Sequence, residues 1–278
     1  MGRVGAVAAG LLRSCHPEPT AAVTLMITAL AVTAGHTVGR VLLILLAVLT
    51  GQLSIGWLND LLDAERDRTV GRPDKPVAAG AVSTRVVGVA TAVAAAACVP
   101  LSLACGALAG TAQLIAVAAG WAYDLGLKSS PLSVLPYVVC FGLLPTFVVL
   151  ALPGAPAPVW WLPLAGALLG AGAHFANVLP DLDDDAATGV RGLPHRLGRT
   201  ASRYAAAVLL LAATVVLAAG SPVPAPLAVA VPVLAALVLA AGFRAGRRPG
   251  SRAPFRSVLA VAGLAVALLL AAGPALSG

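Results

Sequence analysis

Charged residues are scarce in this sequence, and their scarcity excludes a soluble globular domain. Asp, Glu, Lys and Arg make up 10% of the 278 residues, whereas a soluble domain carries roughly 25%. Aromatic residues are also few, at 4%, which argues against a pocket lined tightly by aromatic rings.

The four cysteines are Cys15, Cys98, Cys105 and Cys140. Their spacing indicates neither a metal site nor a disulfide framework, and buried free thiols are expected.

Hydrophobic residues are abundant instead, at 59% of the chain. Stretches without Asp, Glu, Lys or Arg run over residues 19–39, 41–59, 86–123, 129–180, 204–243 and 257–278. A helix that crosses a bilayer needs about 20 apolar residues, so the three short stretches predict one span each and the three long ones two each. The long stretches have turn-like breaks at 103–107, 152–158 and 220–226. The predicted fold class is therefore all-α, a polytopic membrane protein with nine transmembrane helices.

The basic residues lie almost entirely on one side of this topology. With the N-terminus in the cytoplasm, Arg40 is the only one of the 18 Lys and Arg residues that faces outward. This bias follows the positive-inside rule. We therefore expect a multi-pass protein of the cell membrane, surrounded by membrane lipids, with a cytoplasmic N-terminus. The topology also accounts for the net charge of +7, so no nucleic-acid partner is predicted.

The first twenty residues do not have the pattern of a cleaved signal peptide. Arg13 and Glu18 interrupt any apolar core there. Val4, Val7 and Leu11 fit one face of a short helix at the membrane interface.

Two clusters rich in aspartate lie four spans apart, each at the cytoplasmic end of a span. The first contains Asn59, Asp60, Asp63 and Asp67, and the second contains Asn177, Asp181, Asp183, Asp184 and Asp185. This repeat predicts one integral-membrane domain over residues 1–278, built from four-helix halves at about 19–128 and 129–243 and a ninth helix at about 256–276. Halves related by an axis along the membrane normal would bring both clusters to a central cavity that opens near the cytoplasmic side.

The spacing within each cluster places its polar side chains on one helix face. Residues 59, 63 and 67 are four apart, and residues 177, 181 and 185 repeat that step, so each set shares a face. Pro180 is expected to kink the sixth span just before the second cluster. Charged loop residues are often only a solvated surface, but two matched stripes four spans apart favour a binding site.

Paired carboxylate stripes suit magnesium. Mg²⁺ is usually held by one or two carboxylates, with water and substrate phosphates completing its octahedron. Two stripes with Mg²⁺ would therefore hold a diphosphate from both sides. Basic residues follow both clusters and could fork onto phosphate oxygens; they are Arg66, Arg68, Arg72, Lys75 and Arg191.

At these residues the chain resembles the UbiA-type intramembrane prenyltransferases. The family's N-D-x-x-D-x-x-x-D motif resembles residues 59–67, and its D-x-x-x-D motif resembles residues 181–185. The basic stretch R-P-D-K-P at 72–76 and the Tyr123–Lys128 loop are similar to further family features. Two features depart from the pattern. Ser129 and Ser130 stand where many relatives add a basic residue, and the second motif holds the extra acids Asp183 and Asp184.

The resemblance implies a reaction and a set of roles. A polyprenyl diphosphate would lose its diphosphate with the help of Mg²⁺, and the resulting allylic carbocation would alkylate an aromatic or other lipophilic acceptor. The implied metal ligands are Asp60, Asp63, Asp67, Asp181, Asp184 and Asp185. The expected catalytic residues are Asp63, Asp67, Asp181, Asp185, Tyr123 and Lys128. Expected to bind the substrate are Asn59, Arg66, Arg72, Lys75, Asn177 and Arg191.

Two polar residues inside spans are candidates for contact with the acceptor. Gln52 lies seven residues before Asn59, and His174 lies seven before Asp181, so each shares a face with its cluster. Polar side chains within the membrane commonly mark a site, although either residue could instead bond a neighbouring helix. His195, in the loop G-L-P-H-R-L-G, is expected at the surface.

Two other functions stay open. In a membrane terpene cyclase of the same superfamily, the carbocation would close on itself without an acceptor. A transporter could use acidic helix ends for cation-coupled movement, but transporter charges lie near the midplane, and here they lie at the cytoplasmic ends.

Overall fold

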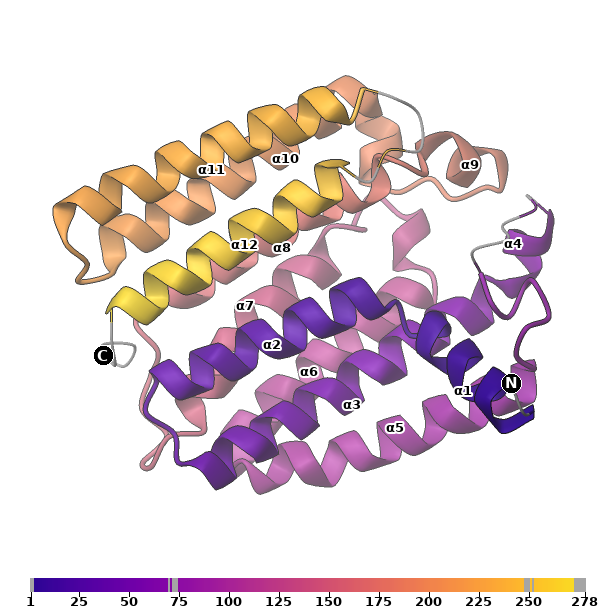
Figure 1. Cartoon of the computed structure of the whole chain (residues 1–278), viewed down its shortest axis with the longest axis horizontal. Helices are drawn as coiled ribbons and strands as arrows, with labels where there is room; N and C mark the ends of the chain where they lie inside the picture. Colours follow the sequence, from indigo (N-terminus) through magenta and orange to yellow (C-terminus); the bar gives the residue numbers. More distant parts are fainter. Residues whose placement is uncertain (1–2, 70, 72–74, 248–250, 252, 273–278) are drawn as a thin grey trace.

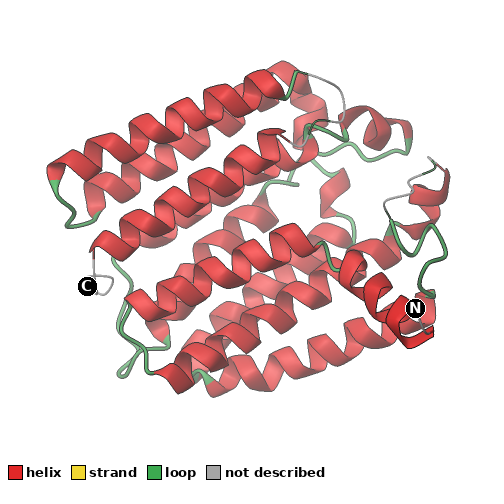
Figure 2. Cartoon of the chain, viewed as in Figure 1, coloured by secondary structure: helices red, strands yellow, loops and turns green. Residues whose placement is uncertain are grey.

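The computed structural model describes residues 3–69, 71, 75–247, 251 and 253–272, and in this part of the chain it is all-helical (Figure 2). The longer helices are α2 (Pro17–Thr33), α3 (Val38–Leu62), α5 (Thr84–Ala104), α6 (Ala107–Asp124), α7 (Leu135–Leu150), α8 (Trp161–Val178), α10 (Leu193–Gly220), α11 (Ala225–Ala245) and α12 (Ala253–Ala272). The shorter elements are α1 (Arg3–Ser14), α4 (Ala64–Thr69), α9 (Leu182–Ala187) and the 3₁₀ helix η1 (Leu127–Ser129). The predicted all-α class is confirmed.

The helix breaks inside the long apolar stretches fall where turn chemistry predicts them. Between α5 and α6, Gly106 has a φ of 121°, which favours glycine. The segment L-P-G-A-P-A-P joins α7 to α8, and S-P-V-P joins α10 to α11. Proline removes a backbone donor that a continuing helix would need, and several prolines close together with glycine favour a break there.

Within the described residues, four helices are long and apolar enough to cross a membrane, namely α3, α5, α10 and α11. Residues 135–150 and 253–268 form shorter apolar helices. The positions of the longer helices agree with the predicted spans, while the count of nine spans, the two halves and the central cavity stay predictions.

The longer helices close into a ring-like bundle (Figure 1). α3 contacts α2, α5 and α6, and the series then continues through α7, α8, α10, α11 and α12, which returns to pack on α2. The fully buried side chains of Ile44, Phe147 and Leu162 belong to the larger apolar core between these helices. The two six-residue helices α4 and α9 lie at the same end of the bundle in Figure 1. This end carries both acidic clusters.

Small residues let α7 and α8 pack closely. A Cβ atom on Gly166 would clash with the Phe141 carbonyl, and one on Gly170 would clash with the Tyr137 carbonyl. Glycines four residues apart allow this close approach of two helices in a membrane. The contact fixes α8, which leads into the second acidic cluster, against the aromatic residues of α7.

The N-terminal helix α1 is docked on the end of α3 that leads into the first acidic cluster. Trp57 Nε1 donates a hydrogen bond of 2.9 Å to the Leu11 carbonyl. Gly56 lies against the backbone of Cys15, where a Cβ atom would clash with the Cys15 carbonyl. The predicted short N-terminal helix is therefore present, and its end is held against α3 by direct backbone contact.

Gly56→Ala should destabilise this contact. The added methyl group meets backbone atoms that cannot rotate away, and overpacking of this kind costs about 1–3 kcal/mol. Thermal unfolding in detergent should therefore show a lower midpoint. The matched control is Gly39→Ala, also in α3, where a Cβ atom meets nothing within 4 Å and the midpoint should not fall. Equal midpoints for the two variants would contradict the close contact.

Candidate functional site

The first acidic cluster keeps its helical register across a helix break. α3 ends at Leu62 and α4 begins at Ala64. Backbone hydrogen bonds nevertheless run from Asp63 N to Asn59 O at 3.0 Å and from Asp67 N to Asp63 O at 2.8 Å. Because the i to i+4 pattern persists, Asn59, Asp63 and Asp67 form the stripe that their spacing predicts.

The aspartates of the second cluster follow a helix end and not a kink, while Asn177 still belongs to α8. α8 ends at Val178, and Asp181 precedes the first residue of α9. The expected kink at Pro180 is therefore wrong, because the chain leaves the helix before the proline. The Asp185 amide bonds the Asp181 carbonyl at 2.8 Å, so these two residues keep the predicted step of four.

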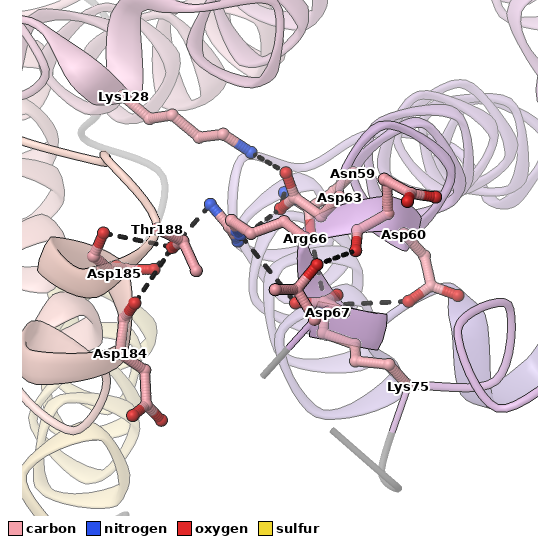
Figure 3. A network of polar contacts seen from close by, with 12 residues as sticks. Asn59, Asp60, Asp63, Arg66, Asp67, Lys75, Lys128, Asp184, Asp185 and Thr188 are labelled. Atoms are coloured by element: carbon pink, nitrogen blue, oxygen red, sulfur yellow. Dashed lines mark hydrogen bonds and ion pairs between the residues drawn. The ribbon is translucent and has the colours of Figure 1, made fainter. Parts of the chain in front are cut away.

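The Arg66 guanidinium joins the two clusters (Figure 3). Its Nη2 lies 2.9 Å from Asp63 Oδ2, and its Nε lies 3.9 Å from Asp67 Oδ1. From α9, Asp185 Oδ1 lies 3.8 Å from Arg66 Nη1. Acids that are more than 110 residues apart in the sequence therefore face one shared space.

Two lysines complete the charge balance of the first cluster. Lys128 Nζ donates to Asp63 Oδ1. Lys75 Nζ lies 3.7 Å from Asp60 Oδ1 and 3.8 Å from Asp67 Oδ2. These three aspartates are only 1–6% exposed, and buried carboxylates require such pairing. The predicted Tyr123–Lys128 loop therefore reaches the acidic cluster through its lysine.

The Asn59 amide has its hydrogen-bonding capacity used within the protein. Its Nδ2 donates to Asp63 Oδ2 at 3.2 Å and to Asp124 Oδ1 at 2.8 Å, and its Oδ1 accepts from Lys75 Nζ at 3.4 Å. Asp124 is the last residue of α6. From the sequence, its place directly after Tyr123 at the end of the fourth span left two roles open, binding of substrate or capping of local structure. Asn59 therefore organises the carboxylates around it.

The residues of the second cluster point in different directions. Asp185, with a side chain 19% exposed, contacts Arg66, and burial raises the pKa of its carboxyl to about 6, which Arg66 partly offsets. Asp183 pairs with Arg199 at 2.9 Å and is exposed. Asp184 is exposed, and its carboxylate points away from the first cluster in Figure 3. Of these three acids, Asp185 is the one that faces the first cluster.

His195 is placed differently from its expected surface position. Its side chain is 7% exposed, and its Nε2 lies 3.7 Å from Asp185 Oδ2. The expectation was wrong because the segment from Leu193 belongs to α10 and not to a loop. His195 therefore lies beside the shared space.

The donor set fits a divalent cation that is bound together with its substrate. Asp60 Oδ1 and Asp124 Oδ2 are buried and accept no hydrogen bond from the described residues. In the part of the chain that the structure describes, no three carboxylate, imidazole or thiol groups converge closely enough to form a metal site by themselves. An Mg²⁺ ion that takes one or two carboxylates and completes its shell with water and phosphate oxygens matches this arrangement.

A group of aromatic side chains begins at Tyr123, next to Asp124 in the chain. The ring of Tyr137 is 5.2 Å from that of Tyr123, 5.0 Å from that of His174 and 6.2 Å from that of Phe141, measured between centroids. Asn177 Nδ2 donates to the Tyr137 hydroxyl at 3.3 Å. Phe141 also lines an apolar cavity of about 80 Å³ between α2, α7, α8, α10 and α12. The aromatic group therefore extends from Tyr123, which precedes Asp124 in the chain, to Phe141 at the apolar cavity.

His174 connects several helices. It is fully buried, and its Nε2 lies 3.0 Å from Ser133 Oγ. Ser133 Oγ in turn accepts the Leu193 N–H at 2.9 Å. These contacts correspond to the structural role that the sequence left open for His174. Ser133 and Tyr137 had no local signal in the sequence.

Several predicted substrate-binding residues have no described contact with the acids; besides Asn177 and His174, they include Gln52 and Arg191. Gln52 is half-buried on α3. Arg191 is exposed, and its backbone carbonyl accepts from Arg196 Nε at 3.2 Å. Arg72 lies outside the described residues. Their roles stay predictions.

Comparison with solved structures finds proteins with a similar fold. A UbiA homolog from Aeropyrum pernix K1 in its apo form has a TM-score of 0.74 and 22% identity, over 90% of this chain and 96% of that chain. A UbiA homolog from Archaeoglobus fulgidus bound to GPP and Mg²⁺ has a TM-score of 0.68 and 17% identity, over 94% and 99%. A structure of digeranylgeranylglyceryl phosphate synthase in membranes has a TM-score of 0.68 and 17% identity, over 97% and 99%.

Sequence comparison gives the family directly. The search of curated protein sequences returned no match. In a scan against protein-family models, residues 20–262 match the UbiA prenyltransferase family. This match covers most of the chain, includes both acidic clusters and confirms the resemblance that the motifs indicated. The chain belongs to the UbiA prenyltransferase family.

Proposed function

We propose that this protein transfers a prenyl group from an allylic prenyl diphosphate to an aromatic or other lipophilic acceptor, with Mg²⁺ as cofactor. The observation that carries the proposal is the position of Arg66, which contacts acids of both clusters. A diphosphate with its cation in that space would be surrounded from both halves of the chain. The A. fulgidus homolog bound to GPP and Mg²⁺ supports this choice of ligand.

Ligand binding in this proposal is an exchange of partners. In the structure, Lys128, Arg66 and Lys75 neutralise Asp63, Asp67 and Asp60. When Mg²⁺ is bound, it supplies the positive charge that these carboxylates need. The basic side chains then turn to the diphosphate oxygens, where Arg66 can form paired hydrogen bonds.

The departure of the diphosphate is the step that this charge arrangement accelerates. The bond between the allylic carbon and the bridging oxygen breaks, and the electron pair leaves with the diphosphate. Lys75, Arg66 and Lys128 stabilise the negative charge that develops there. The acceptor then attacks the allylic cation, forms the new bond and loses a proton. Bound Mg²⁺ contributes further charge stabilisation, and its proposed ligands are Asp60, Asp63, Asp67, Asp181, Asp184 and Asp185.

The hydrocarbon part of the substrate requires a dry space. The aromatic group of Tyr123, Tyr137 and Phe141 extends from the residue next to Asp124 to the apolar cavity. An allylic cation near these rings would be attracted by their negative faces, and the cavity would receive the start of the prenyl chain. Gln52 and His174 remain the proposed contacts of the acceptor.

The membrane arrangement is part of the proposal. The helices at the nine predicted positions would all cross the bilayer, in one domain of two four-helix halves and a ninth helix. Both acidic clusters and the N-terminus would face the cytoplasm. The excess of Lys and Arg at the acidic end supports this orientation, since a water-soluble diphosphate head would then enter from the cytoplasm.

Asp63→Asn should lower prenyl transfer by about 10²-fold or more, because removal of one well-placed electrostatic group typically costs ~10²–10³ in rate. The assay uses purified protein, geranyl diphosphate and Mg²⁺ with candidate acceptors, and follows diphosphate release and the lipid products by mass spectrometry. Chelation by EDTA should stop the wild-type reaction. The matched control is Glu65→Gln, since Glu65 lies in the same segment, is 89% exposed and pairs only with Arg68 among the described residues. Near-normal turnover by Asp63→Asn would overturn the assignment.

Asp185→Asn and Asp183→Asn should differ sharply. Asp185 faces Arg66 and the first cluster, so its loss should reduce turnover by about 10²-fold. Asp183 pairs with Arg199 at the surface, where an ion pair is worth about 0–1 kcal/mol, so its variant should keep most of the activity. Asp184→Asn in the same series tests whether Asp184, which points away from the first cluster, contributes to turnover. Equal losses for the 183 and 185 variants would show that the second cluster acts through its total charge and not through one carboxylate.

A further inference from the structure

His16 lies at the elbow between α1 and α2 in an unusual backbone conformation. Its φ is 54° and its ψ is 70°, the left-handed region that only a few per cent of non-glycine residues occupy. It precedes the first residue of α2, but its side chain makes no capping hydrogen bond. Helix capping therefore does not account for the conformation, and a strained residue of this kind points to a functional constraint.

The surrounding contacts determine this conformation. The Cys15 carbonyl accepts a hydrogen bond of 2.7 Å from Thr20 Oγ1 and lies directly against Gly56. The Thr20 amide bonds the His16 carbonyl at 3.1 Å. The elbow is thus fixed on α3, one turn before Asn59.

The elbow brings the imidazole to Lys75. His16 Nε2 lies 3.3 Å from Lys75 Nζ. An ammonium group has three donors and no acceptor, so in a hydrogen bond between these two groups Nε2 accepts and the ring proton lies on Nδ1. The other groups around Lys75 Nζ are Asn59 Oδ1 at 3.4 Å, Asp60 Oδ1 at 3.7 Å and Asp67 Oδ2 at 3.8 Å. As an acceptor from Lys75, the His16 imidazole is uncharged, and it comes from the junction of α1 and α2, whereas the aspartates around Lys75 belong to α3 and α4.

We propose that His16 is a positioning residue that holds Lys75 in the site while its carboxylate partners change. This inference rests on the proposed function, because the carboxylates beside Lys75 are those proposed to turn to Mg²⁺. When they do, Lys75 loses the charges that hold it. An uncharged imidazole acceptor can keep the ammonium in place, and it does not repel the diphosphate as a carboxylate would.

Two substitutions of His16 distinguish the effect of losing the hydrogen-bond acceptor from the effect of changing the backbone strain. His16→Asn keeps a residue that tolerates the left-handed region, but its side chain is too short to place an acceptor where Nε2 lies. His16→Gln places Oε1 at about that distance, although glutamine is less tolerant of this conformation than asparagine or histidine. With geranyl diphosphate and Mg²⁺, kcat/KM should fall about tenfold for His16→Asn, as expected for a lost hydrogen bond to a charged group.

Between these two variants, the order of catalytic activity should be the opposite of the order of thermal stability. His16→Gln should keep kcat/KM within about threefold of wild type, with a thermal midpoint no higher than that of His16→Asn. Glu18→Gln is the matched control, since Glu18 is exposed on the same elbow and lies 3.9 Å from Arg256 at the surface. If turnover followed the thermal midpoint across these variants, His16 would have only a structural role and the proposal would fail.

A double-mutant cycle tests whether His16 acts through Lys75. In a Lys75→Met background, His16→Asn should cause no further loss, because effects that pass through one group are not additive. Additive losses would mean that His16 acts without Lys75, which would overturn the inference.

The same cycle is run on binding of inorganic pyrophosphate with Mg²⁺ by calorimetry. If wild type bound pyrophosphate but never transferred a prenyl group, the proposed function would fail while the His16–Lys75 coupling was still measured.

Discussion

The Asp63 carboxylate accepts from three donors that come from three different segments. Lys128 of η1 contacts one oxygen, and Arg66 of α4 and Asn59 of α3 contact the other. A carboxylate that is 6% exposed must be paired in this way, because an uncompensated buried charge costs several kcal/mol. Since Arg66 also reaches Asp185 on α9, the pairing of this one acid draws the two acidic clusters together.

The helices position these charged groups, but the charged groups contribute little to the stability of the helix bundle. A buried ion network is weak support for stability, because its attraction is largely offset by the loss of hydration. Stability comes instead from the apolar cores and from close helix contacts such as those of Gly166, Gly170 and Gly56. The charged residues can therefore change partners without opening the bundle, and the reaction that we propose requires such a change.

The sequence predicted the features that depend on local patterns. Charge-free stretches located the helices, and the steps of four located the two carboxylate stripes. Contacts between distant segments left no such pattern. Tyr137 and Ser133 join the site because α7 and α10 pack beside it, and no spacing in the sequence reveals those neighbours. His195 was misplaced because the segment G-L-P-H-R-L-G was taken as a loop, whereas α10 begins at Leu193. Pro180 was misread because proline is common both at a kink and just after a helix end, and α8 ends at Val178.

A structure with Mg²⁺ and a non-reactive allylic thiodiphosphate would test the central claim most directly. The account predicts that the diphosphate group and its metal contact Asp63 or Asp67 together with Asp181 or Asp185. It also predicts that Arg66 has turned from the carboxylates to the diphosphate. A ligand held by one cluster alone, or bound away from the space between α4 and α9, would contradict it.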